Sequence, residues 1–228
     1  ASRPRVQIDR DAVPSSRMPI RPRDLPEPRA VRPQLVLVGG GVRCGKSAFA
    51  LARACQLGPR RLFIATAQAF DEEMRKRIRD HRAERGALFE TLEEPLALPE
   101  TLRQHASRVD VVVIDCLTLW LSNTLLQDDR QVEPRIETLA EALRERKSHV
   151  IVVTNEVGMG LVPDNALGRR FRDCAGRAHQ VLARESDEIY MGAMGCLLRL
   201  RPDPVALMPF TPVTAPFTAE ENEHVDRR

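Results

Sequence analysis

Short apolar runs alternate with longer charged or amphipathic segments along the middle of the chain. Each apolar run ends in polar residues, which is typical of buried strands in a parallel sheet. The predicted strands cover residues 35–38, 62–65, 89–92, 110–115, 150–154, 188–191 and 197–200. The predicted helices cover residues 47–55, 71–85, 98–107, 132–147 and 167–184. This alternation over a 228-residue chain predicts a single α/β domain with a mostly parallel central sheet flanked by helices.

Both ends of the chain lack the alternation. The first 34 residues hold eight Arg against four Asp or Glu and seven of the 17 prolines, so the formal charge of +3 belongs to this segment. Such a composition buries too little apolar surface to offset the entropy of ordering, and we expect residues 1–33 to be a disordered leader. Five prolines after Arg201 predict a loose tail over residues 202–228. The folded domain then spans residues 34–201.

Composition also limits the class of protein. No apolar stretch approaches the length that spans a bilayer, and no signal peptide opens the chain, so we expect a cytoplasmic protein. The five cysteines form no C-x-x-C pair, which argues against a zinc site or a disulfide framework and favours reduced thiols. Because the Arg-rich leader has no interleaved aromatic residues, we expect no nucleic-acid binding, although that alternative predicts salt-sensitive affinity that disappears with the leader.

A phosphate-binding loop directly follows the first predicted strand. The letters GGVRCGKS match G-x-x-x-x-G-K-S, in which backbone N–H groups surround a polyphosphate at the start of a helix. Lys46 is expected to reach the β- and γ-phosphates, and the Ser47 hydroxyl to bind Mg²⁺. The residues expected to contact the nucleotide are Gly40, Gly41, Val42, Arg43, Cys44, Gly45, Lys46 and Ser47. The loop predicts binding of a nucleoside triphosphate without naming the reaction.

Residues at the carboxyl ends of the other strands are the next candidates, because ligands of open α/β sheets lie beyond that edge. Asp115 closes the strand VVVID, and we expect it to hold Mg²⁺ together with Ser47, in preference to capping the next helix. Thr66-Ala67-Gln68 and Asn155-Glu156 end two further strands. Asn155 and Glu156 receive no role beyond positioning, and a structural cap is an equal alternative.

The charged helix predicted at residues 71–85 carries a nucleophile candidate. Arg77, His81 and Arg85 stand four residues apart and therefore share one helical face. A neutral imidazole between two guanidinium groups is suited to attack phosphorus and form a phosphoramidate. A solvated charged face is the alternative, and periodicity alone would favour it.

Four segments together carry a resemblance to a known family. They read GGGVRCGKS, IATAQAFDEEMRKRIRDHRAERGALFETLEEP, VIDCLTLWLSN and VTNEVGMGLVPDNALGRRFRDCAGRAHQVLARESDEIY. In this order and spacing they resemble the bifunctional adenosylcobinamide kinase / adenosylcobinamide-phosphate guanylyltransferase of cobalamin biosynthesis. The resemblance covers residues 35–200.

The resemblance implies a RecA-like P-loop fold and two reactions. ATP or GTP phosphorylates the hydroxyl of the aminopropanol arm of adenosylcobinamide. GTP then guanylylates a histidine, which by motif position is His81, and the GMP passes to adenosylcobinamide phosphate, giving adenosylcobinamide-GDP. Mg²⁺ accompanies the nucleotide, and the protein is expected to be a homo-oligomer, possibly a trimer. Besides the loop, the implied nucleotide-binding residues are Ala65, Thr66, Ala67, Arg82, Ala83, Glu84, Arg85, Glu93 and Asp115.

The chain departs from the family pattern at three places. Cys44 replaces the usual Ser of the loop, residues 86–89 read GALF where Pro and Trp are common, and His179 stands where Asn is common. These changes leave the phosphate chemistry in place and bear more on contacts to the corrinoid. Two enzymatic or regulatory alternatives remain: a single-activity P-loop small-molecule kinase, and a GTP-binding switch. A switch is disfavoured because Asn155-Glu156 stands where an N-K-x-D guanine clamp would begin.

Overall fold

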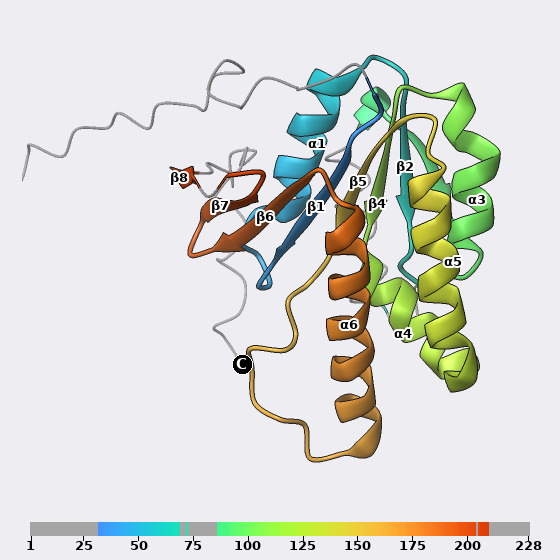
Figure 1. Cartoon of the computed structure of the whole chain (residues 1–228), viewed down its shortest axis with the longest axis vertical. Helices are drawn as coiled ribbons and strands as arrows, with labels where there is room; N and C mark the ends of the chain where they lie inside the picture. Colours follow the sequence, from blue (N-terminus) through green and yellow to red (C-terminus); the bar gives the residue numbers. More distant parts are fainter. Residues whose placement is uncertain (1–31, 69–71, 73–85, 204, 210–228) are drawn as a thin grey trace, which may run out of the picture.

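Eight strands form one sheet in the order β3-β2-β4-β5-β1-β6-β7-β8 (Figure 1). The computed structural model describes residues 32–68, 72, 86–203 and 205–209. The strands β1 to β6 pair in parallel, and β7 and β8 extend the sheet in antiparallel fashion. Their bounds are β1 Leu35–Gly40, β2 Arg61–Ala65, β3 Glu90–Glu93, β4 Val111–Asp115, β5 His149–Val153, β6 Glu188–Ala193, β7 Cys196–Arg201 and β8 Val205–Pro209.

Helices cover both faces of the parallel strands. The α-helices are α1 Lys46–Leu57, α3 Leu98–His105, α4 Leu117–Gln127, α5 Val132–Arg144 and α6 Ala166–Glu185, and the short 3₁₀ turns are η2 Gly86–Leu88, η3 Ala106–Arg108 and η4 Asp129–Gln131. Helix α1 packs on one face, and α3, α4, α5 and α6 pack on the other (Figure 1).

Alternation of side chains along each strand explains the two-sided core. In β1, Val36 and Val38 join the cluster under Phe49 of α1, whereas Leu35 and Leu37 join the cluster under the other helices. Because both faces are buried, the parallel strands read as continuous apolar runs, which made them easy to find in the sequence.

The order of the strands separates the two nucleotide motifs. Strand β5 lies between β1, which leads into the phosphate-binding loop, and β4, which ends at Asp115. The predicted mostly parallel sheet between flanking helices, with the phosphate-binding loop after its first strand, is therefore confirmed.

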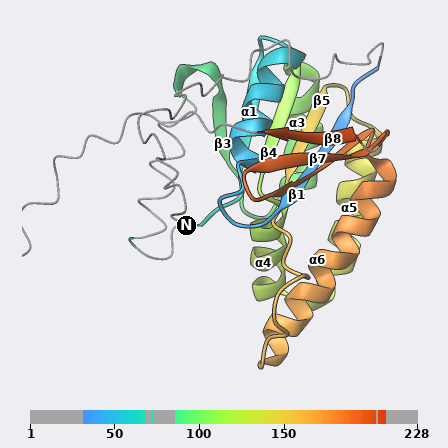
Figure 2. The ribbon, with the colours of Figure 1, turned by 90° about the vertical axis from the view of Figure 1, so that its left-hand side faces the viewer.

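Two elements of the structure differ from the sequence prediction. Helix α4 was not predicted, because residues on most of its sides are buried and its sequence LTLWLSNTLLQ has no polar face to produce an amphipathic period. The expectation that prolines exclude regular structure after Arg201 is wrong for residues 205–209, because these residues form strand β8. Pro209 stands at the end of an edge strand, where one side needs no backbone donor. Figure 2, which faces the β8 edge, shows β7 and β8 turned away from the direction of the parallel strands.

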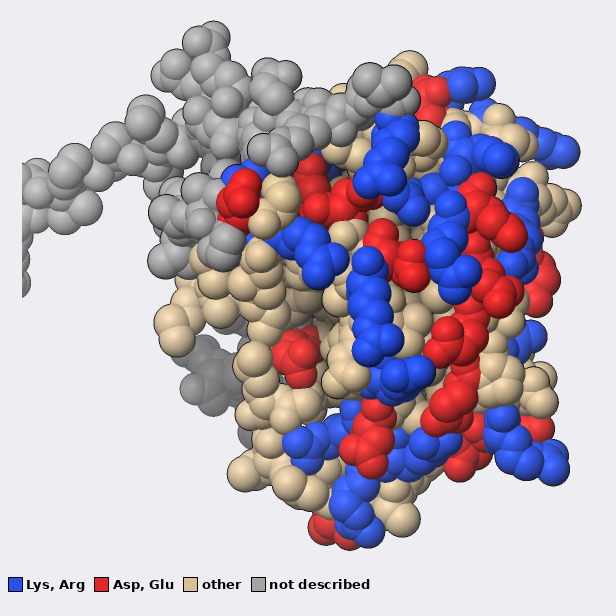
Figure 3. Space-filling view, in the orientation of Figure 1, with Lys and Arg blue, Asp and Glu red and all other residues tan. Residues whose placement is uncertain are grey.

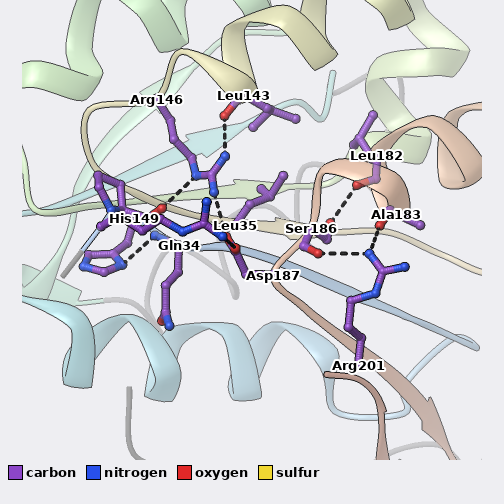
Figure 4. A network of polar contacts seen from close by, with 12 residues as sticks. Gln34, Leu35, Leu143, Arg146, His149, Leu182, Ala183, Ser186, Asp187 and Arg201 are labelled. Atoms are coloured by element: carbon purple, nitrogen blue, oxygen red, sulfur yellow. Dashed lines mark hydrogen bonds and ion pairs between the residues drawn. The ribbon is translucent and has the colours of Figure 1, made fainter. Parts of the chain in front are cut away.

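A polar network closes the sheet edge opposite the phosphate-binding loop (Figure 4). Asp187 accepts hydrogen bonds from the Leu35 backbone N–H at 2.8 Å and from Arg146 at 2.6 Å. Arg32 also pairs with Asp187, and the Pro33 carbonyl accepts from Arg146 at 3.1 Å. Two residues that the sequence analysis assigns to the leader thus contact the domain.

Within the part of the chain that is described, every helix is too short or too polar to cross a membrane.

Candidate nucleotide and phosphoryl-transfer site

Glycines at both ends of the phosphate-binding loop allow its backbone conformation. Gly45 has φ 94°, which only glycine adopts readily, and it directly precedes α1. Gly40 has φ 138°, and a β-carbon added there would lie 2.3 Å from the carbonyl oxygen of Gly192 in β6. Gly40 must therefore be glycine both for its dihedral angle and for the close approach of β6.

Lys46 lies beneath this loop and is 7% exposed. Its Nζ donates to the Gly41 carbonyl at 2.5 Å and lies 3.6 Å from Cys44 Sγ. The α1 helix has no side-chain cap and no acidic residue in its first turn, so its N-terminal backbone donors and dipole favour an anion. A buried cation and a helix N-terminus therefore meet where the sequence predicts phosphate.

The Ser47 hydroxyl donates a 2.7 Å hydrogen bond to Asp115 Oδ2. This pair joins the first turn of α1 to the end of β4, as the sequence predicts for the metal-binding residues. Hard oxygen ligands suit Mg²⁺, which keeps several waters and is usually completed by substrate phosphates. In residues 32–68, 72, 86–203 and 205–209, no group of three or more His, Cys, Asp and Glu could hold a metal by itself. The donor set therefore fits a Mg²⁺ ion that arrives with a nucleotide.

Thr66 fixes the strand end that carries Asp115. Its Oγ1 donates to the Cys116 carbonyl at 2.7 Å and accepts from the Cys116 N–H at 2.8 Å. Its own N–H donates to the Asp115 carbonyl at 3.2 Å, and its carbonyl accepts from Asn123 Nδ2 at 2.9 Å. Because Thr66 is fully buried and these bonds occupy its hydroxyl, its side chain orients Asp115. Ala65 and Ala67 flank it at the end of β2.

Some of the other residues predicted to contact the nucleotide lie away from the phosphate-binding loop or outside the described residues. Glu93 ends β3 opposite Ala65, and β2, β4 and β5 lie between β3 and β1. The structure therefore places Glu93 beside residues 65–67 and away from the phosphate-binding loop. His81, Arg82, Ala83, Glu84 and Arg85, together with most of the predicted helix 71–85, lie outside the described residues.

Sequence reasoning missed a hydrogen-bonded set around Cys116. Asn155 Nδ2 donates to Thr118 Oγ1 at 3.1 Å, and that oxygen lies 3.2 Å from Cys116 Sγ. Burial, and secondarily the charge of Asp115, raises the pKa of the Cys116 thiol to about 11, so the thiol stays protonated at neutral pH. The sequence signal for Asn155 was its position just after a strand, but no motif marked Thr118.

A second set follows β5 on the side of the phosphate-binding loop. The Glu156 N–H donates to the Gly40 carbonyl at 3.0 Å, and Glu156 Oε2 lies 3.6 Å from His179 Nδ1. His179 Nε2 lies 2.8 Å from Thr154 Oγ1. Burial lowers the pKa of His179, with Glu156 opposing that shift, so the imidazole is neutral near pH 7. These three residues connect α6 to the first residue of the loop.

Several large apolar side chains are exposed on the loop and on the segments that follow β5 and β6. They belong to the loop itself, to the connection of residues 154–165, to the start of α6 and to the β6–β7 turn, and they are Val42, Met159, Leu161, Val162, Leu167 and Met194. Figure 3 shows few charged groups on the flank formed by the β5–α6 connection and the β6–β7 hairpin, whereas charges crowd the surface over α3, α5 and α6.

Comparison with known proteins decides the family. The protein family described as "Cobinamide kinase / cobinamide phosphate guanyltransferase" matches residues 36–200 of this chain. The chain belongs to this family. The match includes the loop, Asp115, Glu156 and His179, so the resemblance seen in the sequence is confirmed.

Two relatives match this chain along nearly the whole of their own length. The bifunctional adenosylcobalamin biosynthesis protein CobP of Pseudomonas aeruginosa is 45% identical over 170 residues, which cover 74% of this chain and 98% of CobP. The protein CobU of Salmonella typhimurium, with the same description, is 35% identical over 181 residues, covering 73% and 99%. Among solved structures, the RadB recombinase shows 16% identity and a TM-score of 0.48, covering 78% of this chain and 87% of that chain. The last likeness is too slight to carry an argument.

Proposed function

We propose that this chain is a bifunctional enzyme of cobalamin biosynthesis. It phosphorylates adenosylcobinamide with ATP or GTP, and it then transfers GMP from GTP to adenosylcobinamide phosphate to give adenosylcobinamide-GDP. The observation that carries the proposal is the Ser47–Asp115 contact beside Lys46, within a stretch that matches a kinase and guanyltransferase family. Both activities need a bound nucleoside triphosphate, and this is the part of the molecule built for one.

The phosphate-binding loop holds the nucleotide in this proposal. Lys46 neutralises charge on the β- and γ-phosphates, and the N–H groups from Gly40 to Ser47 surround them. Ser47 and Asp115 hold Mg²⁺, which offsets phosphate charge when it is bound. In this proposal Ala65, Ala67 and Glu93 form the part of the nucleotide site away from the loop, and Thr66 supports it by orienting Asp115; the pairing of Glu93 with Ala65 supports this grouping. Arg82, Ala83, Glu84 and Arg85 complete it.

The second reaction passes through His81. An imidazole nitrogen attacks the α-phosphorus of GTP, so a P–N bond forms and the bond to pyrophosphate breaks. A phosphate oxygen of adenosylcobinamide phosphate then attacks the same phosphorus, the P–N bond breaks, and the histidine is regenerated. The support for His81 is its spacing with Arg77 and Arg85 on one helical face and its place in the family motif.

We also propose that the enzyme works in the cytoplasm as a homo-oligomer, with a trimer as the expected state. The exposed apolar residues of the 154–165 connection and the β6–β7 turn support an oligomer, because surfaces of this kind are usually covered by a protein partner. Sedimentation or light scattering of the purified chain measures the oligomeric state directly.

Labelled GTP tests the guanylyl step. After incubation with α-³²P-GTP, the proposal expects protein-bound label that is stable in alkali and released by acid, as a phosphoramidate is. His81→Ala should lose the label and guanylyl transfer while it still phosphorylates adenosylcobinamide, since γ-phosphoryl transfer needs no covalent protein intermediate. A full-strength adduct in His81→Ala would overturn the assignment. Kinase activity without any adduct or GDP product in the wild type would indicate a single-activity kinase.

A further inference from the structure

The residues that follow β5 emerge at the centre of the proposed active site. Because β5 lies between β1 and β4, its carboxyl end opens between the phosphate-binding loop and Asp115. Asn155 turns toward the Asp115 side, where it binds Thr118. Glu156 is tied to the loop side by its N–H, which donates to the Gly40 carbonyl at 3.0 Å.

The Glu156 carboxylate is held by contacts at both oxygens. Oε1 accepts from the Gly158 N–H at 2.5 Å, and Oε2 lies 3.6 Å from His179 Nδ1. A β-carbon added at Gly158 would come within 2.8 Å of Oε1, so the glycine permits this approach. The Glu156 side chain is nevertheless 24% exposed, so part of it remains open to solvent.

One neutral form of His179 suits both of its neighbours. With the proton on Nδ1, the ring directs an N–H toward Glu156 Oε2, which lies 3.6 Å away and beyond hydrogen-bond distance. In that form Nε2 accepts from the Thr154 hydroxyl, which lies 2.8 Å away. Thr154 is 2% exposed, so it fixes the ring and does not meet substrate.

The Glu156 carboxylate has no Lys or Arg partner in the described part of the chain. His179 faces it at 3.6 Å, and that imidazole is neutral near pH 7. Arg172, which also belongs to α6, donates to the Gly158 carbonyl at 2.8 Å. A carboxylate without a guanidinium or ammonium partner, on a residue whose backbone N–H binds the first residue of the phosphate-binding loop, has the chemistry of a general base.

We propose that Glu156 is the general base of the kinase reaction, and that His179 and Thr154 are positioning residues that orient its carboxylate. The substrate hydroxyl gives its proton to Glu156 as its oxygen forms a bond to the γ-phosphorus. The bond between that phosphorus and the bridging oxygen breaks, and the nucleoside diphosphate leaves with the bonding electrons. Glu156 later returns the proton to solvent. This inference rests on the proposed kinase function.

The guanylyl reaction does not need the same base. Its nucleophiles are a neutral imidazole and a phosphate oxygen that is already anionic at neutral pH, so no hydroxyl proton has to be removed. The two activities of one protein therefore separate a role in proton transfer from a role in folding or in nucleotide binding, because the latter would affect both.

Glu156→Gln is the direct test, because it keeps the size of the side chain and an oxygen for the Gly158 N–H. Kinase activity is assayed with adenosylcobinamide, and guanylyl transfer with adenosylcobinamide phosphate supplied directly. We expect kcat of the kinase reaction to fall about a hundredfold or more, with guanylyl transfer within about threefold of wild type. Glu137→Gln, an exposed carboxylate on α5, is the matched control and should leave both reactions unchanged.

His179 variants test the positioning role. His179→Leu removes both ring nitrogens and should lower kinase kcat about tenfold with little change in nucleotide KM, whereas His179→Asn keeps a donor and should recover part of the rate. Equal losses of both activities in Glu156→Gln, or an undiminished kinase rate, would overturn the inference. A wild-type enzyme that forms no adenosylcobinamide phosphate would instead refute the proposed function itself, so the two failures are distinguishable.

Discussion

Ser47 Oγ and Asp115 Oδ2 lie 2.7 Å apart although 68 residues separate them in the chain. The contact joins the start of α1 to the end of β4 across the intervening strand β5. A hydroxyl and a carboxylate in contact at a helix N-terminus place two hard ligands where a nucleotide-bound Mg²⁺ would sit. The relationship depends on the sheet order, which brings the two strand ends to one edge.

Replacement of this pair should change the Mg²⁺ requirement. Asp115→Asn keeps the shape of the side chain but removes its charge, so we expect the Mg²⁺ concentration for half-maximal activity to rise about tenfold or more. Ser47→Ala should act in the same direction, and Ser47→Thr, which retains the hydroxyl, is its control. Initial rates measured across a Mg²⁺ titration give the result. A wild-type titration curve for Asp115→Asn would contradict the metal role.

Lys46→Ala should reduce both activities while leaving the fold intact. Its ammonium group is buried under the loop, within 2.5 Å of the Gly41 carbonyl, and compensates phosphate charge in either reaction. Nucleotide affinity from calorimetry, kinase rate and guanylyl transfer should all fall, with an unchanged circular dichroism spectrum. Unaltered GTP affinity and turnover would remove the loop from the mechanism.

Two neighbouring glycines should respond differently to alanine. A β-carbon at Gly40 would meet the backbone of Gly192 at 2.3 Å and also require an unfavourable φ, whereas a β-carbon at Gly41 has no atom within 4 Å. Gly40→Ala should therefore lower the thermal midpoint by several degrees and weaken nucleotide binding, because β6 and the loop must separate. Gly41→Ala is the matched control for stability. Similar thermal midpoints for the two variants would contradict the close approach of β6.

The sequence predicts those helices and strands whose buried positions form a regular pattern of apolar residues. Strands such as β4 and β5, buried on both faces, gave continuous apolar runs, and α6 gave a clear amphipathic period. The sequence does not predict α4 because this helix is buried on most sides, and it does not predict β8 because the prolines after Arg201 favour irregular structure. The local pattern of apolar and polar residues indicates which sides of a segment are buried, but it does not indicate which other segments pack against it.

The candidate site was predictable only as far as motifs and strand ends reach. Lys46, Ser47 and Asp115 follow from the loop motif and from the rule for strand ends. The contact between Glu156 and His179 depends on how α6 returns along the sheet, and 23 positions in sequence separate these residues without a periodic signal. Thr66 was expected to bind nucleotide, and the structure shows its side chain engaged with Cys116.

Arg53 and Glu188 form a buried ion pair whose loss should destabilise the domain. Arg53 is fully buried, its Nη2 lies 2.7 Å from Glu188 Oε1, and Tyr190 donates to the other carboxylate oxygen at 2.8 Å. Arg53→Met leaves that carboxylate without its cation, and we expect a loss of about 3–5 kcal/mol in the free energy of unfolding. Arg103→Met, at an exposed pair on α3, is the control and should change little. Urea denaturation measures both, and equal small effects would contradict the buried pair.

His149 should make the stability of the domain depend on pH between neutrality and mild acid. Its Nδ1 accepts the Gln34 backbone N–H at 3.1 Å, which requires the unprotonated nitrogen (Figure 4). Burial, followed by the charges of Arg53 and Arg146, lowers the pKa of His149 below its ordinary value of 6.5, and Asp110 opposes the shift.

The sign of the effect follows from which state binds the proton first. Because the folded pKa is depressed, the unfolded chain is protonated at a higher pH than the native protein, so the contribution of His149 is complete above about pH 6.5. It is lost as the pH falls from 6.5 through the folded pKa. His149→Asn, which keeps an acceptor within the side chain, should flatten the stability curve between pH 7.5 and 5.5, although His179, whose pKa is also lowered, keeps its own contribution to the slope. Urea denaturation midpoints at half-unit intervals of pH test this, and a variant whose slope equals that of wild type would show that His149 does not titrate with folding.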